Sequence, residues 1–206
     1  MDLEQEPELA ATLCCEAQDR LWSRVVTLTD DQVRAPSALA GWTRGHVLTH
    51  LARNADAHRR RLLGSLTGDD VPKYAGGEEQ RDHEIESGAT RAGDEILADL
   101  RSSLVGLEEV LTRCSVAGWP HGDLLGGSHY GVAACPAHRL REVEMHHVDL
   151  GLGYTPADWP DEYVAWDLPV LLATVPERLS PPDARRVMAW LAGRGPLDTS
   201  VRLTAW

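Results

Sequence analysis

The sequence predicts a mainly α-helical protein, with a four-helix bundle over residues 1–155 and a small C-terminal α/β region over residues 156–206. Apolar residues recur every three or four positions along three long segments, which is the spacing of one helix face, and a fourth helix is expected after them. A long Gly-rich segment separates the last two helices, as in bundles with one long connection. The residue pattern changes after the segment GLGYTPADWP, which indicates a separate C-terminal region.

The first two helices are predicted by their apolar stripes and their ends. Residues 4–28 carry one apolar stripe, and we expect Asp30 and Asp31 to break this helix. Thr43 favours a helix N-cap, so the second helix is expected to begin after it and to run until Gly68. Its Arg-rich face, including residues 59–61, is expected to be solvated. Residues 68–77 have the Pro and Gly content of a connection.

The third and fourth helices flank the long connection. From Ile85 to Leu111 the apolar spacing holds through more than seven turns, so we expect one continuous helix there. Residues 115–136 are rich in Gly and are expected to form a crossover loop. The fourth helix is expected over residues 136–150. The interior of such a bundle commonly holds metal or ligand sites on facing helices.

The C-terminal region is predicted to contain two helices and one strand. Helical patterns cover residues 161–179 and 182–193, and residues 200–206 alternate as a strand does. Because no partner strand is predicted, we expect a small and incomplete unit. The unpaired strand leaves association with another chain open, so the oligomeric state is not predicted.

Composition and charge exclude several classes of protein. The 206 residues carry a net charge of −12, which disfavours nucleic acid phosphates and acidic lipid surfaces as partners. No segment approaches the roughly 18 consecutive apolar residues of a membrane span, and the acidic N-terminus is unlike a signal peptide. We therefore expect a cytoplasmic protein. The four cysteines lack zinc-ribbon or disulfide spacing, so free and mostly buried thiols are expected.

Three residues are predicted to be metal ligands. Glu142 and His146 are four residues apart in the fourth helix, so both project from one face. In the second helix, His50 lies next to the apolar stripe that faces the bundle interior. Two imidazoles and one carboxylate would leave one position of a tetrahedral zinc ion open, which is typical of a catalytic site. The alternative is a group of side chains that only hydrogen-bond to each other.

Two further histidines are expected to stay outside this site. His46 lies in the first turns of its helix, and a tetrahedral site with one open position does not need it. His147 points roughly 100° away from His146 around the helix, so it is expected to face another neighbour or solvent.

Three motifs occur in order within about residues 5–155: GWTRGHVLTHLARNADAHRRRL, RDHEIESGATRAGDEILADL and RLREVEMHHVDLGLGY. Together they resemble the mycothiol-dependent maleylpyruvate isomerase family, part of the DinB-like superfamily of metal-binding four-helix bundles. The resemblance implies that His50, the last histidine of GHVLTH, is the first zinc ligand. It also implies that Glu142 and His146 complete the protein ligands.

The resemblance also assigns a role to Arg81. The family uses an arginine at the start of its third helix, and Arg81 fits that place, where its guanidinium can bind a substrate carboxylate bidentately. A surface ion pair with Glu78 or Glu84 is the alternative. No residues that bind the thiol cofactor are predicted.

The chemistry that the resemblance implies is a cis–trans isomerisation that depends on zinc and mycothiol. The zinc ion would lower the pKa of the thiol or polarise the substrate carbonyl, and the sequence does not choose between these. Zinc is preferred over nickel, iron or copper because thiol activation needs no redox chemistry. Mycothiol is the expected nucleophile because no cysteine lies in the ligand motifs, and Cys135 is not expected to replace it.

Two other functions stay open. A mycothiol S-transferase that acts on an electrophile would use the same metal and thiol. A noncatalytic binding module would keep the bundle without binding the thiol. The family's isomerases also carry a fuller C-terminal α/β domain than this sequence does, so the substrate is not predicted beyond a small molecule.

Overall fold

The structure is a computed structural model that describes residues 2–120, 124–196 and 200–203. Within these ranges there are eight α-helices and two 3-10 helices, which confirms the mainly α-helical class. The chain divides into two compact units, the first from Asp2 to Trp159 and the second beginning at Pro160. No helix in the described ranges is both long enough and apolar enough to cross a bilayer.

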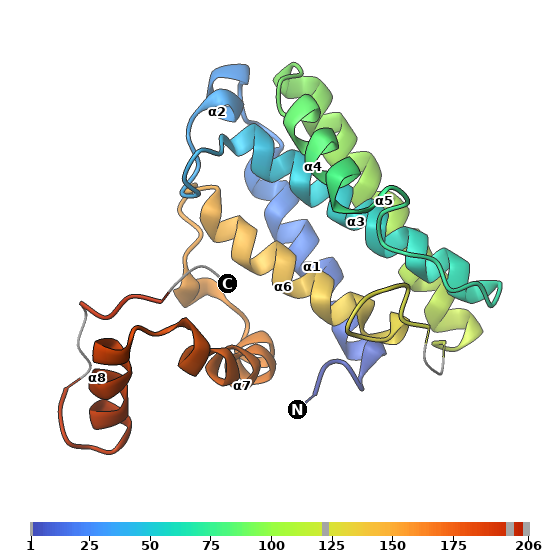
Figure 1. Ribbon diagram of the computed structural model, residues 1–206. Helices are drawn as coiled ribbons and strands as arrows, with labels where there is room; N and C mark the ends of the chain where they lie inside the picture. Colours follow the sequence, from blue (N-terminus) through green and yellow to red (C-terminus); the bar gives the residue numbers. More distant parts are fainter. Residues whose placement is uncertain (1, 121–123, 197–199, 204–206) are drawn as a thin grey trace. The chain divides into compact units, whose positions relative to one another are not determined.

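Four long helices of the first unit form the predicted bundle (Figure 1). They are α1 (Pro7–Val25), α3 (Arg44–Leu66), α5 (Gly93–Ala117) and α6 (Cys135–Asp149). α3 packs on α5 and α1 packs on α6, while contacts of α3 with α6 and of α1 with α5 close the bundle. Leucines from all four helices, such as Leu21, Leu48, Leu100 and Leu140, are fully buried between them. Each such side chain contributes about 1.5–3 kcal/mol of hydrophobic stabilisation.

Hydrogen bonds at Thr43 and Arg44 fix the start of α3. As predicted, Thr43 is the N-cap: its Oγ1 accepts from the His46 backbone N–H (3.3 Å), and Nδ1 of His46 accepts from the Thr43 N–H (3.2 Å). Nε of Arg44 donates to the carbonyl of Leu150, just past the end of α6 (2.7 Å). The first turns of α3 are therefore held beside the last turn of α6.

The two aspartates at 30 and 31 do not act as a simple break. The chain leaves α1 at Val25, and Thr29 then caps a short helix, α2 (Asp30–Arg34), which the sequence analysis did not predict. The acidic side chains lie in the first turn of α2, where they interact favourably with the positive end of the helix dipole.

The predicted continuous helix over residues 85–111 is wrong. The chain forms two helices there, α4 (Gly77–Gly88) and then α5. The Gly93 backbone N–H donates to Oδ1 of Asp30 (2.7 Å), so α5 has an N-terminus of its own that is anchored to α2. The apolar spacing continues across the break because both helices bury one face. α4 packs on α3, where it covers part of the bundle.

The predicted long connection between α5 and α6 is confirmed over its described residues, 118–120 and 124–131, whereas residues 121–123 lie outside the described ranges. It ends in a 3-10 helix, η1 (Val132–Ala134), which leads directly into α6. After α6, the first unit ends with a second 3-10 helix, η2 (Pro156–Asp158).

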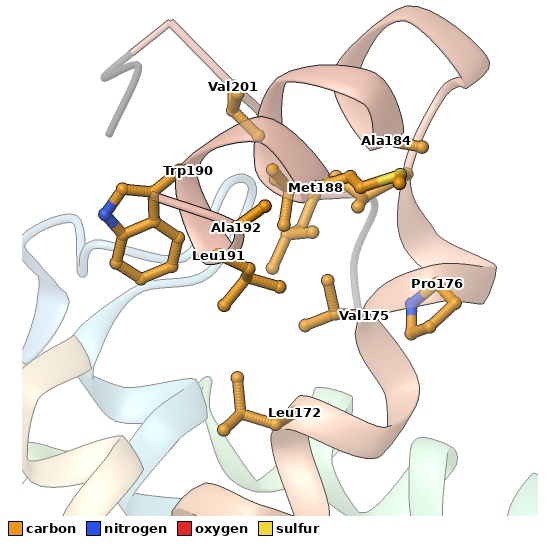
Figure 2. A pocket seen from close by; sticks show the side chains of 12 residues that line it. Leu172, Val175, Pro176, Ala184, Met188, Trp190, Leu191, Ala192 and Val201 are labelled. Carbon is orange, nitrogen blue, oxygen red and sulfur yellow. The ribbon is translucent and has the colours of Figure 1, made fainter. Parts of the chain in front are cut away.

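The second unit contains the two predicted helices, α7 (Asp161–Arg178) and α8 (Pro181–Leu191). Their apolar side chains surround a pocket of about 860 Å³, in which Leu172 and Val175 point toward the α8 side chains (Figure 2).

The strand predicted over residues 200–206 is not found in its described part. Residues 201–203 have no regular secondary structure, and residues 204–206 lie outside the described ranges. A strand requires a hydrogen-bonded partner, and the described residues contain no other strand to supply one.

Candidate metal centre

α3 and α6 bring together the three residues predicted as metal ligands. His50 lies in the second turn of α3, and Glu142 and His146 lie one turn apart on α6. Because α3 packs against α6, the imidazole of His50 reaches the two side chains of the other helix. One potential ligand atom from each residue lies within 4.8 Å of the others.

The carboxylate of Glu142 lies between the two imidazoles. Its Oε2 is 2.9 Å from Nε2 of His50 and 3.6 Å from Nε2 of His146. The two rings are in edge-to-face contact, with centroids 4.6 Å apart. The His50 side chain is only 4% exposed, whereas those of Glu142 and His146 are 29% and 21% exposed. The group is thus anchored in the bundle and open on one side.

Burial and mutual hydrogen bonds set the charges of the group. Burial lowers the pKa of His50 and outweighs its hydrogen bond with Glu142, so this imidazole is neutral at neutral pH. Burial alone would raise the pKa of Glu142, but hydrogen bonds with His146 and His50 hold it well below its usual range. Burial also disfavours protonation of His146, yet hydrogen bonds to Asp149 and Glu142 raise its pKa to about 9.

Asp149 orients His146 and was not found by the sequence analysis. Its Oδ2 lies 2.9 Å from Nδ1 of His146, one turn further along α6. A carboxylate that accepts from the non-ligating nitrogen of a histidine fixes the ring and its tautomer in many metal sites. The signal was present as the i,i+3 spacing in the segment HHVD.

Arg81 reaches the same group from α4. Its Nη2 lies 3.3 Å from Nδ1 of His50, and its Nη1 donates to Oδ1 of Asp82 (2.7 Å). In the described part of the chain, its ion-pair partner is therefore Asp82 and neither Glu78 nor Glu84.

A pocket of about 580 Å³ opens beside these residues, with His50, Glu142 and Arg81 in its wall. The rest of the wall comes largely from two connections, α3–α4 and α5–α6. From them the pocket is lined by Pro72, Lys73, Tyr74, Gly126, Gly127, Ser128, His129 and Tyr130. A cavity of this size, with a few polar groups converging on it, is typical of a small-molecule site.

A buried arginine holds the α5–α6 connection against the bundle. Arg61 is 2% exposed, which corrects the expectation of a solvated face for this residue. Its Nη2 donates to the carbonyls of Leu124, Leu125 and Tyr130 at 3.2, 2.8 and 3.0 Å. Three backbone carbonyls thus take the place of a carboxylate partner, and they fix one wall of the pocket.

Two further histidines and one cysteine lie outside the group of His50, Glu142 and His146, which we call the ligand group. His46 is part of the α3 cap, with its Nε2 3.5 Å from Glu86. His147 turns away from the group and stacks on Tyr154, with ring centroids 3.8 Å apart. All four cysteines are free, and three of them, Cys135 included, are buried, whereas Cys15 is half-buried. Burial raises the pKa of the Cys135 thiol to about 11. A thiol with this pKa is protonated at neutral pH and is a poor nucleophile.

Comparison with known proteins identifies a matching family and solved structures with a similar fold. The family described as the mycothiol maleylpyruvate isomerase N-terminal domain matches residues 14–151. Two crystal structures of the mycothiol-dependent maleylpyruvate isomerase, one of them a mutant, are similar to the chain with a TM-score of 0.69 and 24% sequence identity. The similarity covers 80% of this chain and 70% of that protein. No curated protein sequence matches with significance.

Proposed function

The chain belongs to the family of the mycothiol maleylpyruvate isomerase N-terminal domain, and we propose that it is an isomerase that uses zinc and a low-molecular-weight thiol. Its substrate would be a small unsaturated acid of the maleylpyruvate type, and mycothiol is the proposed thiol. The observation that carries this proposal is the group of His50, Glu142 and His146 beside the pocket.

The ligand residues fit a zinc ion. Ligand atoms bound at about 2.0–2.2 Å in a tetrahedral arrangement lie roughly 3.3–3.6 Å from one another. The three atoms found here lie within 4.8 Å, with Glu142 and His146 3.6 Å apart, so small rotations of the side chains suffice. When bound, the ion would lower the pKa of a thiol or polarise a substrate carbonyl, and it would have one position open for either.

The proposed reaction turns a C=C double bond into a single bond for a short time. A thiolate adds to the double bond, and the electron pair moves onto the conjugated carbonyl to give an enolate. Rotation about the new single bond follows. The enolate then re-forms the double bond and expels the thiolate, so no thiol is consumed.

The thiol must come from outside the chain. The buried Cys135 thiol is protonated at neutral pH, and no cysteine is among the residues that line the pocket. Arg81 is the residue proposed to bind a substrate carboxylate, because its guanidinium faces the pocket next to the ligand group. Its charge would hold the substrate while the double bond rotates.

The proposal is tested by turnover. Zinc-loaded protein is incubated with mycothiol and maleylpyruvate, and the product is followed by NMR while free thiol is titrated. We expect isomerised product, no net loss of thiol, and no reaction without either component. Glu142→Gln, which weakens the ligand group, should abolish turnover.

Two other results would replace the proposal. A stable thioether of mycothiol, detected by mass spectrometry, would indicate an S-transferase. Failure to bind both zinc and mycothiol would indicate a noncatalytic module.

A further inference from the structure

Lys73 is the only lysine in a chain that contains nineteen arginines. It lies in the α3–α4 connection and lines the same pocket as His50, Glu142 and Arg81. The proposed function gives Lys73 no role.

Among the described residues, the ammonium group of Lys73 has no anionic partner. Its Nζ lies 5.5 Å from the centroid of the Tyr130 ring, a weak cation–π contact, and no described carboxylate forms an ion pair with it. The side chain is half-buried, and burial lowers its pKa. Because partly buried charges are normally paired, an ammonium group whose only partner is an aromatic ring lacks the anion that would balance it.

Other cations add to the positive potential around Lys73. Arg61 and Arg81 both disfavour its charged form, while the carboxylate of Glu142 is the group that most offsets its burial. If Glu142 is engaged by a metal ion, its negative charge no longer compensates Lys73. The pocket would then hold uncompensated positive charge, which favours an anionic occupant.

The segment that carries Lys73 is fixed against the opposite connection. Oδ1 of Asp70 accepts from the Gly126 backbone N–H (2.6 Å), and a Cβ at Gly126 would lie 2.2 Å from the Val71 carbonyl oxygen. This close approach places Ser128 in the wall of the pocket that Lys73 also lines. The Ser128 hydroxyl has no partner among the described side chains. An ammonium group and a hydroxyl without a side-chain partner are the kinds of donor that a carboxylate binds.

We infer that Lys73 binds a carboxylate group of the substrate, with the hydroxyl of Ser128 as a second donor. This inference rests on the proposed function, because it assigns a second anchoring point to the same pocket. Acids of the maleylpyruvate type carry two acidic groups, and the inference assigns one of them to Arg81 and the other to Lys73. Lys73 would then be a specificity-determining residue that discriminates against electrophiles without the second acidic group.

The unique lysine allows a direct test. Reductive methylation with ¹³C-formaldehyde labels one lysine and keeps its charge, and the labelled α-amino group gives a separate NMR signal. The probe is succinate, which carries two carboxylates and cannot react with a thiol. We expect a saturable shift of the Lys73 signal on titration of the zinc-loaded protein. An unchanged Lys73 signal at saturating succinate would overturn the inference.

Variants give a second readout. By calorimetry, Lys73→Met should weaken succinate binding by about tenfold or more, as expected for loss of a charged hydrogen bond, and Lys73→Arg should retain most of it. Arg60→Met, which removes an exposed positive charge on α3, is the matched control and should bind as the wild type does. Wild-type affinity in Lys73→Met would also overturn the inference.

The test separates this inference from the proposed function. Succinate binding needs neither thiol nor turnover, so a Lys73-dependent affinity in a protein without isomerase activity would refute only the proposed function. An active isomerase whose KM for a dicarboxylic substrate is unchanged in Lys73→Met would refute only the role of Lys73.

Discussion

Nη2 of Arg81 lies 3.3 Å from Nδ1 of His50, a contact that requires Nδ1 to be the acceptor, because a guanidinium only donates. The proton of the neutral imidazole is therefore on Nε2, which donates to Glu142. If Nε2 instead binds a metal ion, the proton moves to Nδ1, and the contact with Arg81 becomes a contact between two donors. Metal binding at His50 would thus release Arg81 toward the pocket.

Removal of the Arg81 side chain should weaken substrate binding and leave zinc binding unchanged. In Arg81→Met we expect zinc content equal to that of the wild type and a KM raised by about tenfold or more, because a charged hydrogen bond to the substrate is lost. Steady-state kinetics and metal analysis of the same preparation measure both quantities. Arg60→Met is the control. A KM in Arg81→Met equal to that of the wild type would contradict the assignment.

Substitution of Asp149 should weaken the metal site without removing a ligand. Asp149→Asn retains the shape of the side chain but loses the charge that holds Nδ1 of His146. We expect zinc affinity to fall by about 10- to 100-fold, as for other residues that orient metal-binding histidines. Competition with a chromophoric chelator measures this. Asp19→Asn, at an exposed position on α1, should leave the affinity unchanged; equal affinities in both variants would argue against the role of Asp149.

Alanine substitutions at two neighbouring glycines should separate the cost of backbone strain from the cost of a steric clash. Gly126 and Gly127 both have positive φ angles, 52° and 74°, but only a Cβ at Gly126 would clash, at 2.2 Å from the Val71 carbonyl oxygen. Each alanine substitution should cost about 1–2 kcal/mol of backbone strain. Gly126→Ala should be less stable than Gly127→Ala and should also bind succinate more weakly, because the two connections separate. Thermal unfolding and calorimetry of both variants test this, and equal behaviour would refute it.

The free energy of unfolding should decrease as the pH falls from about 6.5 toward 3. Burial lowers the pKa of His138 to about 3 and that of His58 well below its usual range. Below the unfolded pKa the unfolded chain binds protons that the folded chain excludes, so each buried histidine destabilises the fold by up to about 1.4 kcal/mol per pH unit. Urea unfolding of the metal-free protein at several pH values should show this slope.

His138→Gln removes one of these groups and should make the slope shallower. His83→Gln, which alters an exposed side chain on α4, is the matched control and should keep the slope of the wild type. An identical slope in His138→Gln and wild type would show that His138 does not contribute.

Much of the bundle could be predicted because helix periodicity is a local property. The stripes of α1 and α3 lie where the apolar spacing placed them, and Thr43 caps α3 as its side chain predicts. The break between α4 and α5 could not be predicted in this way. It depends on the hydrogen bond from Gly93 to Asp30, residues far apart in the sequence, while the apolar spacing on both sides stays in phase.

The same distinction applies to the site. Glu142 and His146 could be predicted to share a helix face from their spacing, and the structure brings His50 to them through the packing of α3 on α6. The roles of Arg61 and Lys73 could not be predicted. They arise from two connections that meet only in the folded chain. From the sequence alone, a run of arginines or a single lysine in a loop normally indicates side chains that are exposed to solvent.

The central claim, that His50, Glu142 and His146 hold zinc, is tested most directly by metal analysis of protein purified without added metal. We predict about one zinc ion per chain in the wild type and its loss in Glu142→Ala. Glu86→Ala, at an exposed position on α4, should keep the metal, and circular dichroism should show the same helix content in all three proteins. Absence of zinc from the wild type, even after zinc is supplied, would contradict the claim.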